Sequence, residues 1–267
     1  MNHDAHAHLT HHSGGWGDWL FVGVCVSLLF GYGISAVKTS RMYKRWPRYR
    51  YVFWMLGILC AAAATVGPIA HRAHGHFTFH MIGHLLLGML APLLIVFSAP
   101  LTLVLRTVPI KYARRITALL KTRYVRMVCD PFIAALLNIG GLWVLYTTEL
   151  YSAMQEHLVV HLMVHIHIFM AGYVFTVSII PNEPMPHRTS YMYRTLALVV
   201  AAAGHSILSK LIYAFPPNGV PISDAQIGGL LMYYGGDTIE IAMIAVLCYR
   251  WYEAAGSKHP SVAPMNR

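Results

Sequence analysis

The sequence predicts an all-α fold: a polytopic membrane protein with seven transmembrane helices. Hydrophobic residues make up 57% of the 267 residues and charged residues only 11%, which leaves too few polar groups to cover a soluble domain. The apolar residues are gathered in unbroken runs, each long enough to cross about 30 Å of hydrocarbon as a helix. A transmembrane barrel would show alternating segments of about ten residues instead.

The apolar runs divide the chain into one bundle with a tail at each end. They cover roughly residues 18–37, 51–70, 80–105, 130–148, 157–180, 193–214 and 227–250. The third run contains Pro92 and Pro100, which remove backbone hydrogen bonds, so we expect a bend there. The domain division is therefore a histidine-rich tail at 1–17, a transmembrane bundle at 18–252 and a second tail at 253–267.

Basic residues predict how the bundle is oriented. The loops at 38–50 and 106–126 together hold 13 of the 20 Lys and Arg residues. The positive-inside rule places both loops in the cytoplasm, which puts the N-terminus outside and the C-terminus in the cytoplasm. Because the net charge of +10 is segregated by loop and not spread over a folded face, we expect no nucleic acid partner.

The first tail and the cysteines add two expectations. The first run lacks a basic flank and a small-residue cleavage site, so we expect it to remain as a span. Residues 3–12 read HDAHAHLTHH, which is either a solvated tail with incidental metal affinity or a weak collector of metal. The four cysteines lie on separate segments without C-x-x-C spacing, which argues against a disulfide framework or a thiolate site.

Histidines mark the candidate site. Nine of the 17 lie in two short clusters, each at the mouth of an apolar run, and a tenth, His205, lies inside the sixth run. The clusters are His71, His74, His76, His80 and His84, then His157, His161, His165 and His167. An imidazole within hydrocarbon is costly, so its presence usually indicates a functional site.

The predicted topology brings these side chains to one depth. Spacing by four residues places His80 with His84 on one helix face, and His161 with His165 on another. His167 points away from that row, so we expect it to make a helix–helix contact. The sixth and seventh runs place His205 and Asp237 in the same outer half of the membrane.

This arrangement favours a metal site. The candidate ligands are His80, His84, His161, His165, His205, Met232 and Asp237. Imidazoles hold first-row transition ions, and thioether sulphur favours Cu(I). Asp237 and Glu240 either orient ligating imidazoles or form structural pairs with Lys210 or Arg194. We expect no enzyme: the histidine pair lacks the adjacent glutamate of a zinc protease, and the seventh run lacks a Schiff-base lysine.

Four segments carry a resemblance to a known family. They read HMIGHLLLGMLAPLLIVFSAP at 80–100, HLMVHIHIFMAGYVF at 161–175 followed by Pro181, GHSIL at 204–208, and DAQIGGLLMYYGGD at 224–237. In these segments the chain resembles the CtaG family of cytochrome c oxidase assembly factors, seven-helix membrane proteins associated with the caa-type oxidase of Gram-positive bacteria. The resemblance covers nearly the whole chain.

The resemblance implies a role in oxidase maturation. A member of this family would lie in the plasma membrane of a bacterium and assist oxidase subunits, supplying copper to one of their centres. Two other functions stay open on the residues alone. His84 and His165 on facing helices could ligate haem b from both sides, giving an electron-transfer protein. Alternatively, the protein is a metal-free scaffold for oxidase subunits, in which the histidines only pack.

Overall fold

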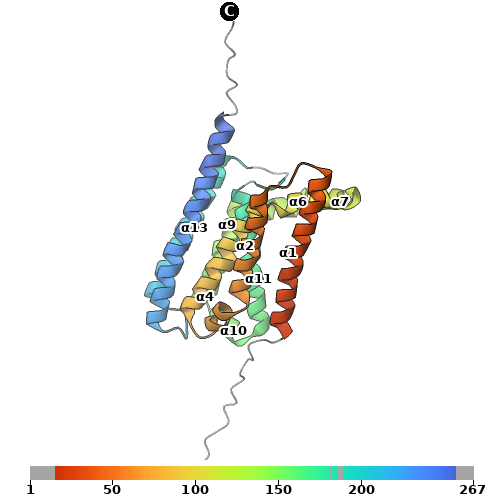
Figure 1. The fold of residues 1–267 in the computed structure, drawn as a ribbon. Helices are drawn as coiled ribbons and strands as arrows, with labels where there is room; N and C mark the ends of the chain where they lie inside the picture. The colour runs from red at the N-terminus through yellow and green to blue at the C-terminus, as the bar shows by residue number, and fades with distance from the viewer. Residues whose placement is uncertain (1–15, 181, 186–188, 257–267) are drawn as a thin grey trace, which may run out of the picture.

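The computed structural model describes residues 16–180, 182–185 and 189–256, and throughout these ranges the regular structure is helical (Figure 1). The first six helices are α1 (Trp16–Met42), α2 (Arg48–Thr65), α3 (Pro68–Ala73), α4 (Phe77–His84), the π-helix η1 (Leu85–Leu90) and α5 (Ala91–Ser98). Next come α6 (Pro100–Thr107), α7 (Ile110–Leu120), α8 (Arg123–Val128) and α9 (Pro131–Thr147). The last four are α10 (Leu150–Glu156), α11 (Leu158–Ile179), α12 (Tyr191–Ala214) and α13 (Ile222–Gly256).

The all-α polytopic membrane fold is confirmed. Within the described residues, six helical segments are long and apolar enough to cross a membrane, and the number becomes seven if the bent pair α9 and α10 counts as one span. That pair bends by 79°. At the two tails, α1 begins at Trp16 and α13 ends at Gly256, so helix extends slightly into both segments that the sequence assigns to tails. The histidine tract at 3–12 lies outside the described residues.

The third span is continuous but irregular. It runs through α4, η1 and α5 from Phe77 to Ser98, and the π-helical turn comes immediately before Pro92. Pro92 has no N–H to donate to the carbonyl of Gly88, and a π-helical turn is a usual way to accommodate such a gap. The span ends at Ala99, whose φ of 54° is left-handed, and α6 begins at Pro100. The bend that the two prolines predict therefore falls at Ala99.

Close helix packing holds the third span against α11. A Cβ atom added at Gly172 would collide with the backbone carbonyl of Gly88, so these two backbones touch and only glycine fits. Because lipid is as apolar as the side chains, such contacts and hydrogen bonds stabilise a membrane bundle more than apolar burial does. This contact fixes the height of η1, and of His84 just before it, relative to α11.

The bundle has two chemically different ends. At the histidine end, the lower end in Figure 1, α1, α4, α11 and α13 begin and α12 terminates. Helices α1 and α13 terminate at the basic end, the upper end in Figure 1, and α6 and α7 also lie there. The basic end contains the two Lys- and Arg-rich loops.

A carboxylate braces a helix at each end of the third span, α6 just after it and α4 at its start. At the basic end Glu183 accepts hydrogen bonds from the backbone N–H groups of Leu101 and Thr102, each at 3.0 Å, and from the Thr102 hydroxyl at 2.9 Å. At the histidine end Asp224, in the first turn of α13, accepts bonds from the N–H groups of Phe77 and Thr78 at 2.6 and 3.1 Å. These bonds give acceptors to the otherwise unpaired N–H groups in the first turns of α6 and α4. The negative carboxylates also interact favourably with the positive end of each helix dipole.

Candidate functional site

Two histidines face each other deep in the bundle. His84 ends α4, and His205 lies in the middle of α12; their exposed fractions are 4% and 1%. Their ring centroids are 6.1 Å apart, and the ring planes are inclined by 35°. None of the four ring nitrogens has a hydrogen-bond partner. The carboxylate of Glu240 approaches His205, with Oε1 3.7 Å from Nδ1, too far for a hydrogen bond.

Leaving these nitrogens unpaired destabilises the fold. A buried polar group without a partner costs about 1–3 kcal/mol, and native structures pair nearly all such groups. Two adjacent imidazoles with no partner on any nitrogen therefore require an explanation. A ligand that bonds to the ring nitrogens supplies one.

Helix α13 closes this pair on one side. A Cβ atom added at Gly236 would collide with the His205 ring, so the glycine makes room for the imidazole. Met232, one turn earlier on α13, is fully buried. Asp237 is half-buried and accepts a hydrogen bond from the Ser206 hydroxyl at 3.4 Å. Thioether and carboxylate groups thus lie on the helix that covers the imidazoles.

A second group of histidines lies at the mouth of the histidine end. The rings of His161 and His165 stack with centroids 4.1 Å apart, and the ring of His74 stacks on His161 at 5.2 Å. His165 donates from Nδ1 to the carbonyl oxygen of His161 at 2.9 Å. His161 Nδ1 is buried and has no hydrogen-bond partner.

His80 lies near both groups and is already hydrogen-bonded. Its exposed fraction is 5%, and its Nε2 is 3.0 Å from the Tyr146 hydroxyl. The ring of Tyr151 meets the His80 ring edge-on at 5.2 Å. His80 is within electrostatic range of both His165 and His84. The Tyr146 hydroxyl therefore holds the His80 side chain in place beside the two groups.

The predicted ligands thus lie in two separate groups and do not surround one common site. Across residues 16–180, 182–185 and 189–256, no three His, Cys, Asp or Glu side chains are already arranged around one point as a metal cage. His84 and His205 form the buried pair, whereas His161 and His165 form the group at the mouth. His167 makes the expected helix–helix contact, with Nε2 3.2 Å from the Leu137 carbonyl oxygen.

Sequence reasoning missed some contacts of the site. His74 joins the mouth group from the α3–α4 connection, and its place in the first histidine cluster was the only signal for it. Glu240 approaches His205, whereas the Lys210 ammonium lies over the Tyr233 ring at 5.0 Å. Arg194 donates from Nε to the Thr189 hydroxyl at 3.1 Å.

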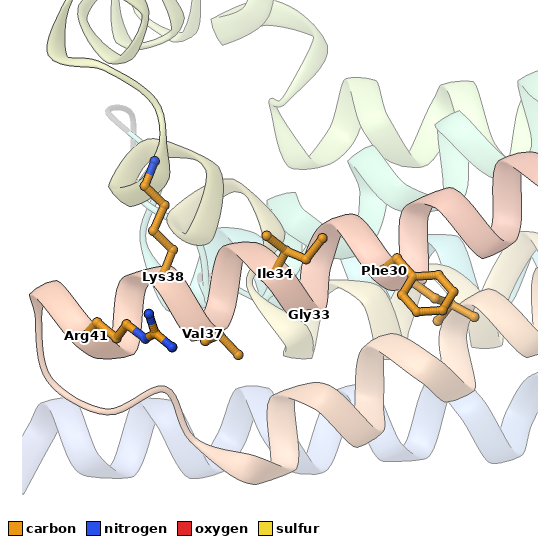
Figure 2. Close-up of a pocket in the computed structure, with 7 residues that line it drawn as sticks. Phe30, Gly33, Ile34, Val37, Lys38 and Arg41 are labelled. Atoms are coloured by element: carbon orange, nitrogen blue, oxygen red, sulfur yellow. The ribbon is translucent and has the colours of Figure 1, made fainter.

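A surface groove on α1 lies apart from these histidines (Figure 2). It measures about 520 Å³ and is lined by α1 alone, through Leu29, Phe30, Gly33, Ile34, Val37, Lys38 and Arg41. Figure 2 shows Phe30 and Ile34 along the groove, with Lys38 and Arg41 toward the basic end. The groove contains no predicted ligand, and its exposed apolar side chains suit contact with lipid.

Comparison with known proteins identifies the family. A family model described as cytochrome c oxidase caa3 assembly factor (Caa3_CtaG) matches residues 29–254. Uncharacterized proteins of Mycobacterium bovis and Mycobacterium tuberculosis are 30% identical over 257 residues, which cover 88% of this chain and 39% of each relative. An uncharacterized Mycobacterium leprae protein is 25% identical over the same share. The chain thus spans about two-fifths of the length of these relatives, and no solved structure matches it. The chain belongs to the caa3 assembly factor family.

Proposed function

We propose that this member of the caa3 assembly factor family helps to mature a cytochrome c oxidase by holding a copper ion between His84 and His205 and releasing it to an oxidase subunit. Family membership supports the assembly role, and the mycobacterial relatives support a bacterial plasma membrane. The segregation of basic residues supports an orientation with the histidine end outside.

The unpartnered imidazole pair carries this proposal. A first-row ion bonds to imidazole nitrogen at about 2.0–2.1 Å, so two rings that share one ion have centroids roughly 6 Å apart. The observed separation of the ring centroids, 6.1 Å, is of this size. The bonds to the ion would also remove the cost of the unpaired nitrogens.

The surrounding groups favour Cu(I) as the cargo. Two neutral imidazoles with a thioether nearby are a soft, low-charge ligand set, which suits Cu(I) better than Mg²⁺ or Ca²⁺. Glu240 and Asp237 lie close enough to His205 to offset the positive charge of the ion. With only two ring nitrogens engaged, the ion keeps open positions through which an oxidase ligand attacks. The chemistry is ligand exchange and not catalysis.

Copper binding to purified protein tests this proposal. The five tract histidines His3, His6, His8, His11 and His12 are first replaced by Gln in the full chain, so that the tract does not contribute. Cu(I) affinity is then measured by competition with a chromophoric chelator. We expect His84→Ala with His205→Ala to weaken binding by about tenfold to a hundredfold or more, because even an outer-shell change costs that much.

The control is His167→Ala, which removes a membrane histidine that only contacts a neighbouring helix. We expect it to leave the affinity unchanged. Equal affinity in the parent and the double variant would overturn the proposal. A Soret band in protein from haem-supplemented cells would favour haem b instead. Normal oxidase assembly in cells that carry the double variant would favour a metal-free scaffold.

A further inference from the structure

We infer that His74, His161 and His165 form a loading site at the histidine end, which captures the copper ion and passes it inward to the His84–His205 pair. This inference rests on the proposed function and adds the direction from which the ion arrives. His74 belongs to none of the segments that carry the family resemblance.

Burial increases in one direction along these imidazoles. His74 is exposed, His161 and His165 are half-buried, and the pair that follows is almost completely buried. Such a gradient lets a hydrated ion lose its water in steps. Dehydration in one step would be costly, because an isolated charge is expensive to move into an apolar interior.

The imidazoles also follow one another closely. Successive ring centroids are 5.2 Å apart from His74 to His161 and 4.1 Å apart from His161 to His165. His84 lies beside Ile168, which is one turn after His165 on α11, since both side chains approach the Cβ position of Gly88, and His84 pairs with His205 at 6.1 Å. The described structure thus contains a series of imidazoles from the exposed mouth to the most buried ring.

The geometry of the mouth group suits brief binding. Stacked rings present their faces to one another, so a ring must turn before its nitrogen reaches a shared ion. His161 Nδ1 has no hydrogen-bond partner, and the hydrogen bond of the ring with the Met154 backbone is the contact that it gives up in turning. His165 uses Nδ1 for the His161 carbonyl and keeps Nε2 for the ion. A site that needs this adjustment binds more weakly than the facing pair, so it releases the ion inward.

Each transfer is a simple ligand exchange. The lone pair of the next neutral imidazole forms a new bond to the ion before the previous nitrogen–copper bond breaks. The ion keeps its oxidation state and no proton moves. His80 lies beside this route and not on it, because its Nε2 is bonded to the Tyr146 hydroxyl.

Loading kinetics test the inference. In the full chain with the tract histidines replaced, Cu(I) is delivered from a weak acetonitrile complex in a stopped-flow instrument. We expect His161→Ala, and His74→Ala to a smaller degree, to slow loading by about tenfold or more, because the parent presents the ion to the pair at a raised effective concentration. The equilibrium affinity should change by less than about threefold, since the pair is intact.

Matched variants separate this result from simple damage. His157→Ala removes an exposed histidine one turn before His161, and its loading rate should equal that of the parent. His161→Met, which restores a soft ligand, should recover the rate. Loading of His161→Ala at the parent rate overturns the inference, as does a loss of equilibrium affinity as large as that of His84→Ala. Copper binding absent from the parent itself would refute the proposed function, and the loading site with it.

Discussion

The two ends of the bundle treat their buried polar groups differently. At the basic end Glu183 accepts bonds from the backbone of α6, Asn182 donates to the backbone of the third span, and Arg250 donates to the Asn182 side chain at 3.3 Å. At the histidine end, five buried ring nitrogens on His84, His161 and His205 have no hydrogen-bond partner. The basic end also leaves two buried atoms unbonded, Thr39 Oγ1 and Arg50 Nε.

On the proposed function, this contrast separates polar groups that stabilise the fold from polar groups that bind the ion. Both ends use the same brace, a carboxylate that accepts two backbone N–H bonds and a threonine hydroxyl, so the chain can satisfy polar groups at either end. The unpaired imidazoles are therefore not a consequence of a poorly packed region. On the proposed function, bonds from these nitrogens to a copper ion offset that cost.

The largest expected effect is the loss of the buried brace. Replacing Glu183 by Ala leaves two N–H donors and the Thr102 hydroxyl without their acceptor, and we expect the free energy of unfolding to fall by about 2 kcal/mol. Asp224→Ala removes the equivalent bonds at a half-buried site where water can replace them, so its cost should be about 1 kcal/mol. Denaturation in mixed micelles measures both. Equal losses would show that burial does not distinguish the two braces.

A substitution at the histidine end should change stability in the opposite direction. His84→Leu removes two unpaired nitrogens and keeps an apolar side chain, so we expect the free energy of unfolding to rise by about 1 kcal/mol while copper affinity falls. The same mixed-micelle denaturation gives the stability. If His84→Leu is instead destabilised as much as Glu183→Ala, the imidazole is a structural group and the contrast between the ends is wrong.

The smallest expected effect is a pH dependence at the basic end. Burial raises the pKa of the Glu183 carboxyl above its ordinary value of 4.5, although the bonds from Thr102 and Leu101 oppose the shift. A carboxyl whose folded pKa is raised contributes stability that is present below its unfolded pKa and is lost as pH rises through the folded pKa. We expect Glu183→Gln to lack this loss of stability. The free energy of unfolding, measured for the parent and the variant from about pH 4 to about pH 7, should show the difference. If the free energy of unfolding of the parent and of Glu183→Gln changed with pH in the same way, the pH dependence would not come from Glu183.

The sequence predicted the spans well but not their interruptions. The expected run at 193–214 corresponds to α12, and the run at 157–180 corresponds to α11. The bend of 79° between α9 and α10 was not predicted, because it depends on groups that the folded chain brings together. Near that bend, Glu149 accepts a hydrogen bond from the distant Asn218 at 2.7 Å. Hydropathy measures length along the chain and carries no information on such contacts.

The site was predictable within a helix but not between helices. Spacing by four residues placed His161 with His165, and their rings do stack. Depth placed His205 level with His165, whereas in the structure its ring faces His84. Which rings meet depends on how each helix is rotated about its axis, and packing sets that rotation. The same spacing therefore predicted equal roles for His80 and His84, although one binds Tyr146 and the other faces His205.

The π-helical turn between His84 and Pro92 makes the number of residues in the third span critical. A π-helix bonds each residue five positions back, one more than an α-helix, so η1 contains an extra residue that offsets the two halves of the span. Deleting one residue there would favour regular α-helix and rotate His84 by roughly 100° relative to the Glu183-braced turn at Ala99. Such a deletion would keep the membrane span and yet turn the imidazole away from α12. A relative with a one-residue gap at this point would therefore need a different partner for its histidine.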